Sequence, residues 1–321
     1  MWVNRSDYYT KKKMSAPKKA ILWIIGILAI IAVIAVIYIG FKILSVGNAI
    51  HNPLDRNKSS LRSSDVSLKN GDPFTIAFFG VDSDAKRAAN NGGQRSDSIM
   101  VVSMNPKKKT SEIVSVPRDT QAKIVGRGTT EKINHAYAYG GPTMAVKSLE
   151  KLLNVPIDHY ATIDMDGMKE MIDTLGGVTV VSNSTFSYDG QSFEKGQKVH
   201  LNGKQAMAFI RSRKESGAGG DFGRQQRQQI VMEALANKLT SVKSVTHFNS
   251  LMNHVKDNVK TDLSIGDINT IRSKYNKAND TVNRHQLDGQ GGIQDDGLYY
   301  FVPSDDSLNS IKSAIDTNLG I

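Results

Sequence analysis

The sequence contains no cysteine in its 321 residues. This absence excludes a disulfide framework, thiolate zinc sites, thiol redox chemistry and cysteine nucleophiles. Three familiar patterns are also missing, namely a phosphate loop of the form GxxxxGK[ST], a GxSxG nucleophile elbow and a zinc-binding HExxH. The seven histidines are scattered along the chain. Several frequent enzyme classes are therefore excluded before any residue is given a role.

The net charge of +10 is unevenly distributed along the chain. Residues 1–42 contain seven basic residues and one acidic residue, so they contribute +6. Residues 43–321 contribute the remaining +4, although they make up most of the sequence. Because nucleic-acid binding depends on a concentrated positive surface, we expect no nucleic-acid partner for this larger part.

A membrane-spanning helix is predicted over residues 20–41, which form an uncharged run of 22 apolar residues. At about 1.5 Å per residue this helix is roughly 33 Å long, enough to cross a hydrocarbon core of about 30 Å. The basic residues Lys11–Lys13, Lys18 and Lys19 precede it, so the positive-inside rule places the N-terminus in the cytoplasm. A cleaved signal peptide is the alternative, but its apolar region would be shorter and followed by a small-residue cleavage site.

The sequence divides into a basic cytoplasmic tail (1–19), the spanning helix (20–41), a polar stalk (42–72) and an extracellular domain (73–321). Apolar runs rich in branched and aromatic residues alternate with helical patterns in that domain. We therefore predict an α/β fold with a central mixed β-sheet flanked by helices. The predicted strands are 74–81, 99–104, 113–116, 159–163, 178–181 and 299–302, and the predicted helices are 142–153, 165–175, 202–210, 222–239, 265–277 and 304–318.

Two aspartates lie at the ends of the first two predicted strands. Asp82 directly follows one strand, and Asp97 directly precedes the other. If these strands are neighbours, both carboxylates meet at one edge of the sheet, where they suit Mg²⁺. On spacing alone, turn or capping roles are the commoner explanation for such aspartates.

Arginine rather than lysine recurs near the ends of predicted elements. A guanidinium fork binds phosphate oxygens in a bidentate manner and stays charged in a partly dry site. On a helix beginning near Phe222, Gln228 shares a face with the last of these arginines, and Asp221 fits the N-cap position. Several arginines without nearby acidic residues to pair with indicate a polyanionic or pyrophosphate ligand. The four positions are Arg118, Arg211, Arg213 and Arg224.

Several strings resemble the LytR-CpsA-Psr family in order over about residues 74–240. They are RSDSIMVVSMNP, SVPRDT, KINHAYAYGG, IDHYATIDMDGMKEMIDTLGGV, LNGKQAMAFIRSR and DFGRQQRQQ. The resemblance implies a membrane-anchored phosphotransferase of a Gram-positive type envelope. It would attach a wall teichoic acid or capsular polysaccharide from a polyprenyl-pyrophosphate carrier to peptidoglycan through a phosphodiester bond.

The resemblance also implies roles for individual residues. Asp82 and Asp97 match the family's metal-binding acids, with Mg²⁺ as the cofactor and Mn²⁺ as the alternative. The catalytic set comprises Asp97, Arg118 and Asp221. The loop 83–94 is long and glycine-containing, which departs from the tightest family members. The residues that match the pyrophosphate-binding positions are Arg95, Arg118, Arg211, Arg213, Arg224 and Gln228.

Two other functions stay open at this point. A polyprenyl-pyrophosphate hydrolase would use the same metal and arginines with water as the nucleophile. A non-catalytic envelope protein could bind anionic polymer or regulate wall enzymes. The general base is also open, because Asp97, Asp221 and a substrate oxygen all remain candidates.

Overall fold

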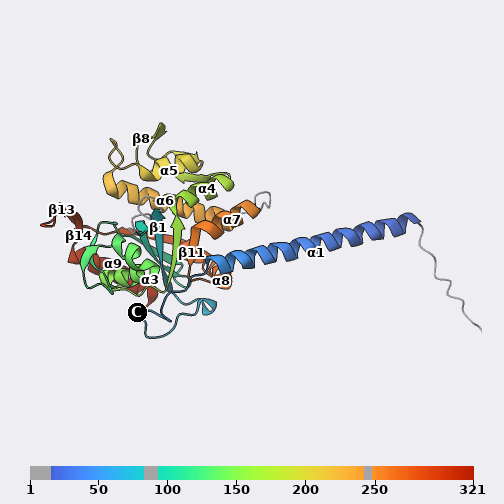
Figure 1. Cartoon of the computed structure of the whole chain (residues 1–321), viewed down its shortest axis with the longest axis horizontal. Coiled ribbons are helices and arrows are strands. Elements are labelled where there is room, and N and C mark those ends of the chain that lie inside the picture. Colours follow the sequence, from blue (N-terminus) through green and yellow to red (C-terminus); the bar gives the residue numbers. More distant parts are fainter. Residues whose placement is uncertain (1–15, 83–92, 242–247) are drawn as a thin grey trace, which may run out of the picture. The chain divides into compact units, whose positions relative to one another are not determined.

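The computed structural model describes residues 16–82, 93–241 and 248–321 (Figure 1). The chain divides into two compact units, one ending at Ser45 and the other extending over Val46–Ile321. Helix α1 (Ala16–Ile50) contains the whole apolar run predicted to cross the membrane. Its described part is long and apolar enough to be a candidate membrane span. A single N-terminal anchor is thus consistent with the structure.

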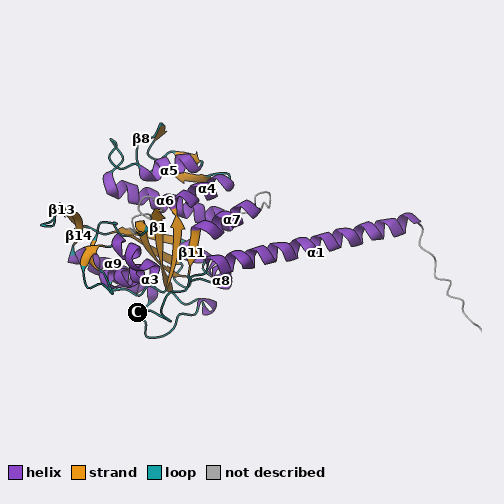
Figure 2. Cartoon of the chain, viewed as in Figure 1, coloured by secondary structure: helices purple, strands orange, loops and turns teal. Residues whose placement is uncertain are grey.

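A six-stranded mixed sheet forms the centre of the second unit (Figure 2). Its strands lie in the order β11-β6-β1-β2-β3-β12. The pairs β1–β2, β2–β3 and β6–β11 are antiparallel, whereas β1–β6 and β3–β12 are parallel. The predicted mixed sheet is confirmed, and β2 and β3 form an antiparallel hairpin. The strand bounds are β1 Phe74–Asp82, β2 Arg95–Asn105, β3 Thr110–Ser115, β6 His159–Asp164, β11 Val259–Thr261 and β12 Thr281–Gln286.

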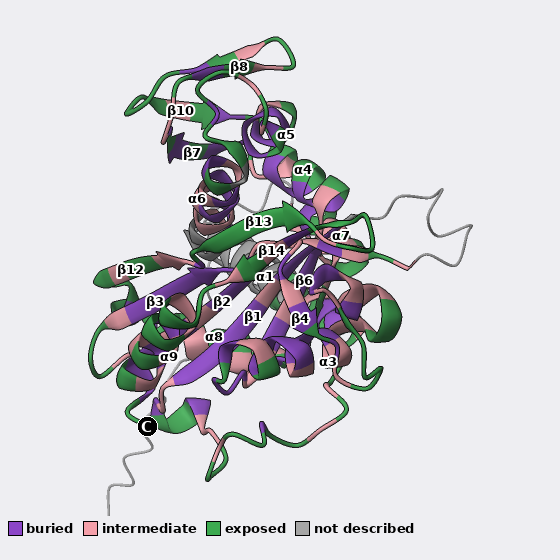
Figure 3. Cartoon of the chain, turned by 90° about the vertical axis from the view of Figure 1, so that its left-hand side faces the viewer, coloured by how far each residue is buried: buried purple, intermediate pink, exposed green. Residues whose placement is uncertain are grey.

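Helices cover both faces of this sheet, as the sequence predicts. Helices α3 (Asn134–Leu153) and α9 (Asp305–Leu319) pack on the face to which Phe79 of β1 points (Figure 3). Phe74, at the start of the same strand, lies in a separate buried cluster with Tyr275 on the other face. Successive strand residues point to opposite sides, so one strand serves two cores.

A third buried cluster lies among α4 (Met165–Thr174), α5 (Gly203–Arg211), α6 (Gly220–Ser241) and α7 (Phe248–Asn258). Short strand pairs adjoin these helices, in the upper part of Figure 3. The remaining elements are η1 Leu68–Asn70, β4 Gln121–Lys123, β5 Thr130–Lys132, β7 Val178–Val181, β8 Phe186–Tyr188, β9 Gln191–Phe193, β10 Lys198–Leu201, α8 Ile265–Lys274, η2 Asn276–Asn279, β13 Gly289–Ile293 and β14 Tyr299–Pro303.

Helix α3 begins earlier than the sequence predicts. The expected helix starts at Pro142, because proline is tolerated in a first helical turn. In the structure α3 runs from Asn134 and is kinked at Gly140 and Gly141, whose φ angles are −143° and 60°. Glycine is needed at the second of these positions because its φ lies in the left-handed region. The kink joins two helical segments. Only the second has apolar residues at regular helical spacing, so the sequence predicts only that segment.

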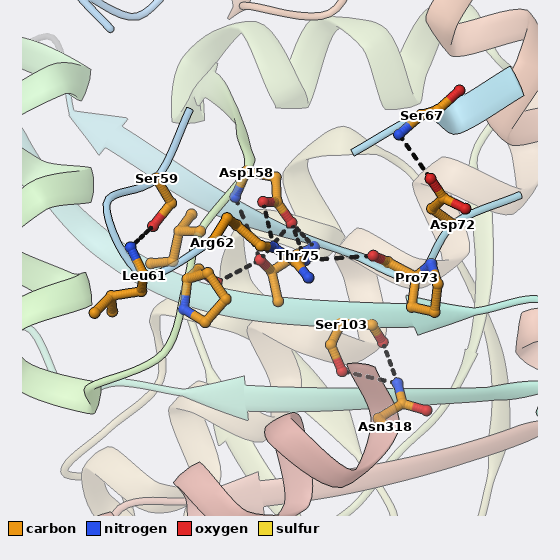
Figure 4. A network of polar contacts seen from close by, with 12 residues as sticks. Ser59, Leu61, Arg62, Ser67, Asp72, Pro73, Thr75, Ser103, Asp158 and Asn318 are labelled. Carbon is orange, nitrogen blue, oxygen red and sulfur yellow. Dashed lines mark hydrogen bonds and ion pairs between the residues drawn. The ribbon is translucent and has the colours of Figure 1, made fainter. Parts of the chain in front are cut away.

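The predicted stalk over 42–72 requires correction. Residues 42–50 continue α1, and the chain from Val46 onward belongs to the compact second unit. Arg62 donates to both carboxylate oxygens of Asp158, from Nε at 2.9 Å and from Nη2 at 2.5 Å (Figure 4). The backbone N–H of Thr75, at the start of β1, donates to the same carboxylate at 2.8 Å. This polar segment is therefore fixed to the sheet by specific contacts that its composition does not indicate.

We expect Arg62→Met to lower the free energy of unfolding by about 3 kcal/mol, because it leaves the nearly buried Asp158 carboxylate without its counter-charge. Denaturant unfolding of the detergent-solubilised chain measures this loss. Arg272→Met is the control, because Arg272 lies at the exposed surface of α8 and should change stability by less than about 0.5 kcal/mol. Equal stabilities of the two variants would show that the Arg62–Asp158 pair does not hold the segment.

Candidate functional site

The pairing of β1 with β2 brings the backbones of the two predicted aspartates, Asp82 and Asp97, close together at the ends of these strands. Asp82 lies opposite Arg95 in the antiparallel register, after an irregularity between Gly80 and Val81. Asp97 is the extra residue of this irregularity, because Ser98 lies opposite Gly80 and Ser96 lies opposite Val81. The backbones of Asp82, Arg95 and Asp97 are therefore close together at the ends of the two strands. The side chain of Asp82 and the loop 83–92 lie outside the described residues.

Asp97 and Arg118 form an ion pair at this edge. Arg118, just after β3, places Nη1 3.0 Å from Oδ2 of Asp97. The next residue, Asp119, forms a second ion pair, in which its Oδ1 atom lies 3.1 Å from Lys132 Nζ. Both side chains of the Asp97–Arg118 pair are partly buried, so the interaction is screened less than a surface pair. Two residues that are distant in sequence thus meet at the predicted site.

Buried polar atoms around this pair lack partners within the described part of the chain. They include Arg95 Nε and Asp97 Oδ1. Buried polar groups are nearly always hydrogen-bonded, so such a cluster indicates a place for a bound group. An anionic oxygen suits the Arg95 donor, and a cation suits the Asp97 oxygen.

The donor set at this edge fits a cation with few protein ligands. The described residues contain no group of three or more acidic or histidine side chains that could hold a metal ion. The backbone of Asp82 lies close to that of Asp97 in the strand register, and the Oδ1 atom of Asp97 is available. Mg²⁺ commonly takes one or two carboxylates and completes its shell with water and substrate phosphate. These residues therefore fit Mg²⁺ better than a metal that needs a complete protein cage.

The remaining predicted residues are distributed differently. Arg224 lines the same hollow as Arg118. Arg213 follows α5, and its backbone N–H donates to Glu215 at 2.7 Å. Arg211 is half exposed, and its Nη2 atom lies 3.4 Å from Oδ1 of Asp166. The structure thus brings Arg95, Asp97, Arg118 and Arg224 into one region and leaves Arg211 at the surface.

Gln228 and Asp221 also lie on α6. Gln228 is buried and lines a small apolar cavity with four methionines: Met100, Met165, Met168 and Met232. This cavity has a volume of about 10 Å³. Helix α6 begins at Gly220, so Asp221 falls within the first turn rather than at the expected N-cap. The side chain of Asp221 lies outside the described residues.

The motif KINHAYAYGG forms a polar network beside Arg95. Glu131 accepts hydrogen bonds from Tyr139 at 2.8 Å and contacts His135 at 3.0 Å. Burial alone would raise the pKa of Glu131, but hydrogen bonds from His135, Thr129 and Tyr139 lower it to about 2. The hydrogen bond to Glu131 raises the pKa of Tyr139, which the charges of Arg127 and Arg95 oppose. This carboxylate therefore stays ionised and fixes the start of α3 near the site.

Arg227 is a buried cation whose role the motif DFGRQQRQQ does not reveal. Its side chain is fully buried, with a relative exposure of 0%. It donates four hydrogen bonds, to the carbonyl oxygens of Phe209 (2.7 Å), Ala218 (2.8 Å) and Ser212 (2.6 Å) and to Ser184 Oγ (3.1 Å). Its position four residues before the buried Val231, on the apolar face of α6, was the available sequence signal.

The Arg227 guanidinium organises the arginine-bearing loop. Ser212, one of its acceptors, lies between Arg211 and Arg213 in sequence, and Ala218 precedes α6. The guanidinium also lies 4.4 Å from the centre of the Phe186 ring. Burial lowers the pKa of Arg227 to about 10, so the group remains charged at neutral pH. One buried cation thus fixes the loop after α5 to the helix that carries Arg224.

We expect Arg227→Met to lower the free energy of unfolding by about 3 kcal/mol, because three buried carbonyl groups lose their donor. Arg227→Lys should recover only part of this loss, since an ammonium cannot reproduce the planar fork. Chemical denaturation measures both variants. Arg284→Met is the matched control: Arg284 pairs with Glu233 at a half-exposed site, and its loss should cost less than about 1 kcal/mol. A loss for Arg227→Met no larger than the control's would contradict the proposed anchoring.

The chain resembles known proteins in both sequence and fold. The LytR_cpsA_psr family profile matches residues 37–317. A polyisoprenyl-teichoic acid–peptidoglycan teichoic acid transferase TagU from Bacillus licheniformis is 40% identical over 309 residues, covering 96% of this chain and 98% of the relative. The solved structure of B. subtilis TagU superposes with a TM-score of 0.63 at 38% identity, covering 77% of this chain and 97% of that one.

A structure described as TagT bound to LIIa-WTA superposes with a TM-score of 0.68 at 28% identity. It covers 84% of this chain and 100% of that one. The family match, the near-complete coverage of its relatives and the shared fold all agree with the motifs around Asp97, Arg118 and Arg224. This chain therefore belongs to the LytR-CpsA-Psr family.

Proposed function

We propose that this protein transfers a glycopolymer of the wall teichoic acid type from a polyprenyl-pyrophosphate carrier to peptidoglycan. The observation that carries the proposal is the Asp97–Arg118 pair beside the buried, available atoms of Arg95 and Asp97. Relatives of nearly the same length are named as teichoic acid transferases of this kind. The reaction would leave the polymer joined to the acceptor through a phosphodiester bond.

In the proposed reaction, an acceptor sugar hydroxyl attacks the phosphorus atom that carries the glycan. A new O–P bond forms, the P–O bond to the carrier phosphate breaks, and the hydroxyl proton passes to Asp97, Asp221 or a phosphate oxygen. Arg95, Arg118 and Arg224 neutralise the pyrophosphate, with Arg213 and Gln228 assigned to the same ligand. Positioning and electrostatic stabilisation of this kind dominate phosphoryl transfer.

Mg²⁺, with Mn²⁺ as the alternative, is the metal proposed for Asp97 and Asp82. When bound, it would offset the negative charge that develops on the departing carrier phosphate. The available Oδ1 atom of Asp97 supports this assignment, since its other oxygen already contacts Arg118. The carboxylate therefore contacts the arginine cradle and has an oxygen left for the metal.

The methionine-lined cavity is the proposed entrance for the carrier's apolar tail. Its volume of about 10 Å³ is room for roughly one water molecule, so it must widen to admit an isoprenoid chain. Methionine side chains are unbranched and rearrange readily, which supports such widening. Met165 and Met168 come from α4, so this helix contributes to the cavity wall.

The proposed membrane arrangement has α1 as a single-pass anchor with the basic N-terminal tail in the cytoplasm. The second unit then lies on the outer surface, where peptidoglycan is found. The charge bias before the apolar run supports this orientation.

The function is tested by supplying the solubilised chain with a lipid-linked glycan, Mg²⁺ and peptidoglycan oligomers, followed by mass spectrometry of the products. Glycan joined to peptidoglycan supports the transferase. Free phosphorylated glycan without attachment indicates the alternative hydrolase. No turnover of the donor would contradict catalysis and favour a polymer-binding role.

We expect Arg118→Ala and Asp97→Asn each to lower kcat by at least about a hundredfold, because each removes a charge from the reacting centre. The assay above measures the rates, and circular dichroism checks that the variants fold. Arg272→Ala and Glu194→Gln are matched controls on exposed residues of α8 and of the turn after β9. Near-normal rates for Arg118→Ala or Asp97→Asn would refute the assignment of the site.

Removal of divalent metal should abolish transfer reversibly. EDTA treatment is expected to stop the reaction, and added Mg²⁺ should restore it, because the pyrophosphate charge is no longer offset without the metal. Calorimetric titration with Mg²⁺ in the presence of a soluble pyrophosphate gives an independent reading, in which Asp97→Asn should bind about tenfold more weakly or worse, as expected when a ligand carboxylate loses its charge. Unchanged activity in EDTA would rule out a metal-dependent reaction.

A further inference from the structure

A groove of polar and aromatic side chains follows α6 on a different face from the methionine-lined cavity. It consists of two adjoining hollows of about 210 Å³ and 630 Å³. The hollows share Phe222, Gln286 and Asp288 in their walls. The smaller one also contains Arg118 and Arg224, so the groove leads away from the pyrophosphate-binding arginines. Its larger hollow falls in the size range of ordinary ligand sites.

The charges along this groove argue against a polyanionic occupant. Arg284, in the larger hollow, donates to both carboxylate oxygens of Glu233 at 2.7 Å. Its neighbour His285 lies 2.6 Å from the carboxylate of Glu112. Asp288 adds a negative charge to the shared wall. Since these basic groups are already paired, the groove beyond Arg118 and Arg224 suits an uncharged ligand better than a phosphate polymer.

The other lining residues are those that recognise sugar rings. Phe222 and Tyr299 are large aromatic side chains with relative exposures of 52% and 42%. A pyranose ring presents a face of C–H groups, which packs favourably on the electron-rich face of an aromatic ring. Amide groups lie close by, as shown by the hydrogen bonds from Asn183 to Gln226 and from Gln286 to Gln225, both 2.9 Å. Amides can donate to and accept from sugar hydroxyls.

We propose that this groove binds the saccharide strand of the acceptor, with Phe222 as its central stacking platform. The inference rests on the proposed function, because it identifies where the second substrate of that reaction lies. The groove and the methionine-lined cavity share no lining residue, so the acceptor and the carrier's tail occupy separate spaces. In-line phosphoryl transfer needs such separation, because the nucleophile and the leaving group lie on opposite sides of phosphorus. Arg118 and Arg224 lie at the end of the groove where the two substrates meet.

Binding is tested by calorimetric titration of the full chain in detergent with a tetrasaccharide of alternating N-acetylglucosamine and N-acetylmuramic acid without stem peptides. The unmodified chain should bind it, and Phe222→Ala should raise the Kd about five- to tenfold, as expected for loss of one aromatic contact. Tyr299→Ala is the second variant and should act in the same direction. Leu61→Ala removes an exposed apolar side chain outside the groove and should leave the Kd unchanged.

Two outcomes of this titration would overturn the proposal: no binding of the tetrasaccharide by the unmodified chain, or equal Kd values for Phe222→Ala and the unmodified chain. A third would be that the groove binds the donor's phosphate polymer instead. Titration with a soluble oligomer of glycerol phosphate tests this, and its binding should not depend on Phe222. If Phe222→Ala weakened the oligomer and spared the tetrasaccharide, the groove would belong to the donor's polymer.

Transfer assays separate this inference from the proposed function. In Phe222→Ala the KM for the peptidoglycan acceptor should rise about fivefold or more, with the KM for the lipid-linked donor unchanged. Transfer by Phe222→Ala with an unchanged acceptor KM would overturn the groove assignment and leave the function standing. Tetrasaccharide binding that depends on Phe222, without any transfer by the unmodified chain, would refute the function and leave the groove standing.

Discussion

The antiparallel pairing of β1 with β2 is the constraint on which the rest of the domain depends. Both strands are central in the sheet, and β1 also carries the parallel contact to β6. Their side chains alternate between two buried cores, so any shift in register would exchange the apolar sets on the two faces. The same register sets Asp82 opposite Arg95, two residues before Asp97. Stability of the sheet and geometry of the site are therefore specified together.

The arginines around this edge have two distinct physical tasks. Arg227 is fully buried, and its donors are taken up by backbone carbonyls and one hydroxyl. Arg95 and Arg118 lie at the surface of the site, partly buried, with the carboxylate of Asp97 among them. A buried guanidinium whose donors are satisfied internally stabilises the scaffold, whereas one at a hollow can bind a ligand. Sequence alone does not distinguish these tasks, because all of these residues are arginines in short motifs.

The sequence was sufficient for the mixed α/β class and for most elements of the sheet, because their apolar periods are clear. It also assigned Asp97 and Arg118 to one site, and the structure brings these two side chains into an ion pair. It failed for β12, whose residues (TVNRHQ) are largely polar and which forms a strand only through its parallel pairing with β3. It failed as well for residues 46–72, where a polar composition suggested a stalk although Arg62 pairs with Asp158. Both failures reflect long-range contacts that override local composition.

The sequence could not locate the groove beside α6, because its walls come from segments far apart in the chain. Phe222 lies at the start of α6, whereas Asp288 and Tyr299 follow β12 and begin β14. The segment after residue 245 carries none of the motifs that resemble the family, and yet it supplies one side of this groove. A region without recognisable motifs can thus shape a site whose charged centre is encoded elsewhere.

The burial of Arg227 has a consequence for how this region orders. Burying a guanidinium in a partly formed pocket costs free energy, because the charge is desolvated before enough hydrogen-bond acceptors surround it. The acceptors come from the end of α5, the loop before α6 and the segment near β8. We therefore expect these segments to order together, because the guanidinium needs acceptors from all of them. Loss of any one of them would leave part of this buried charge without a partner.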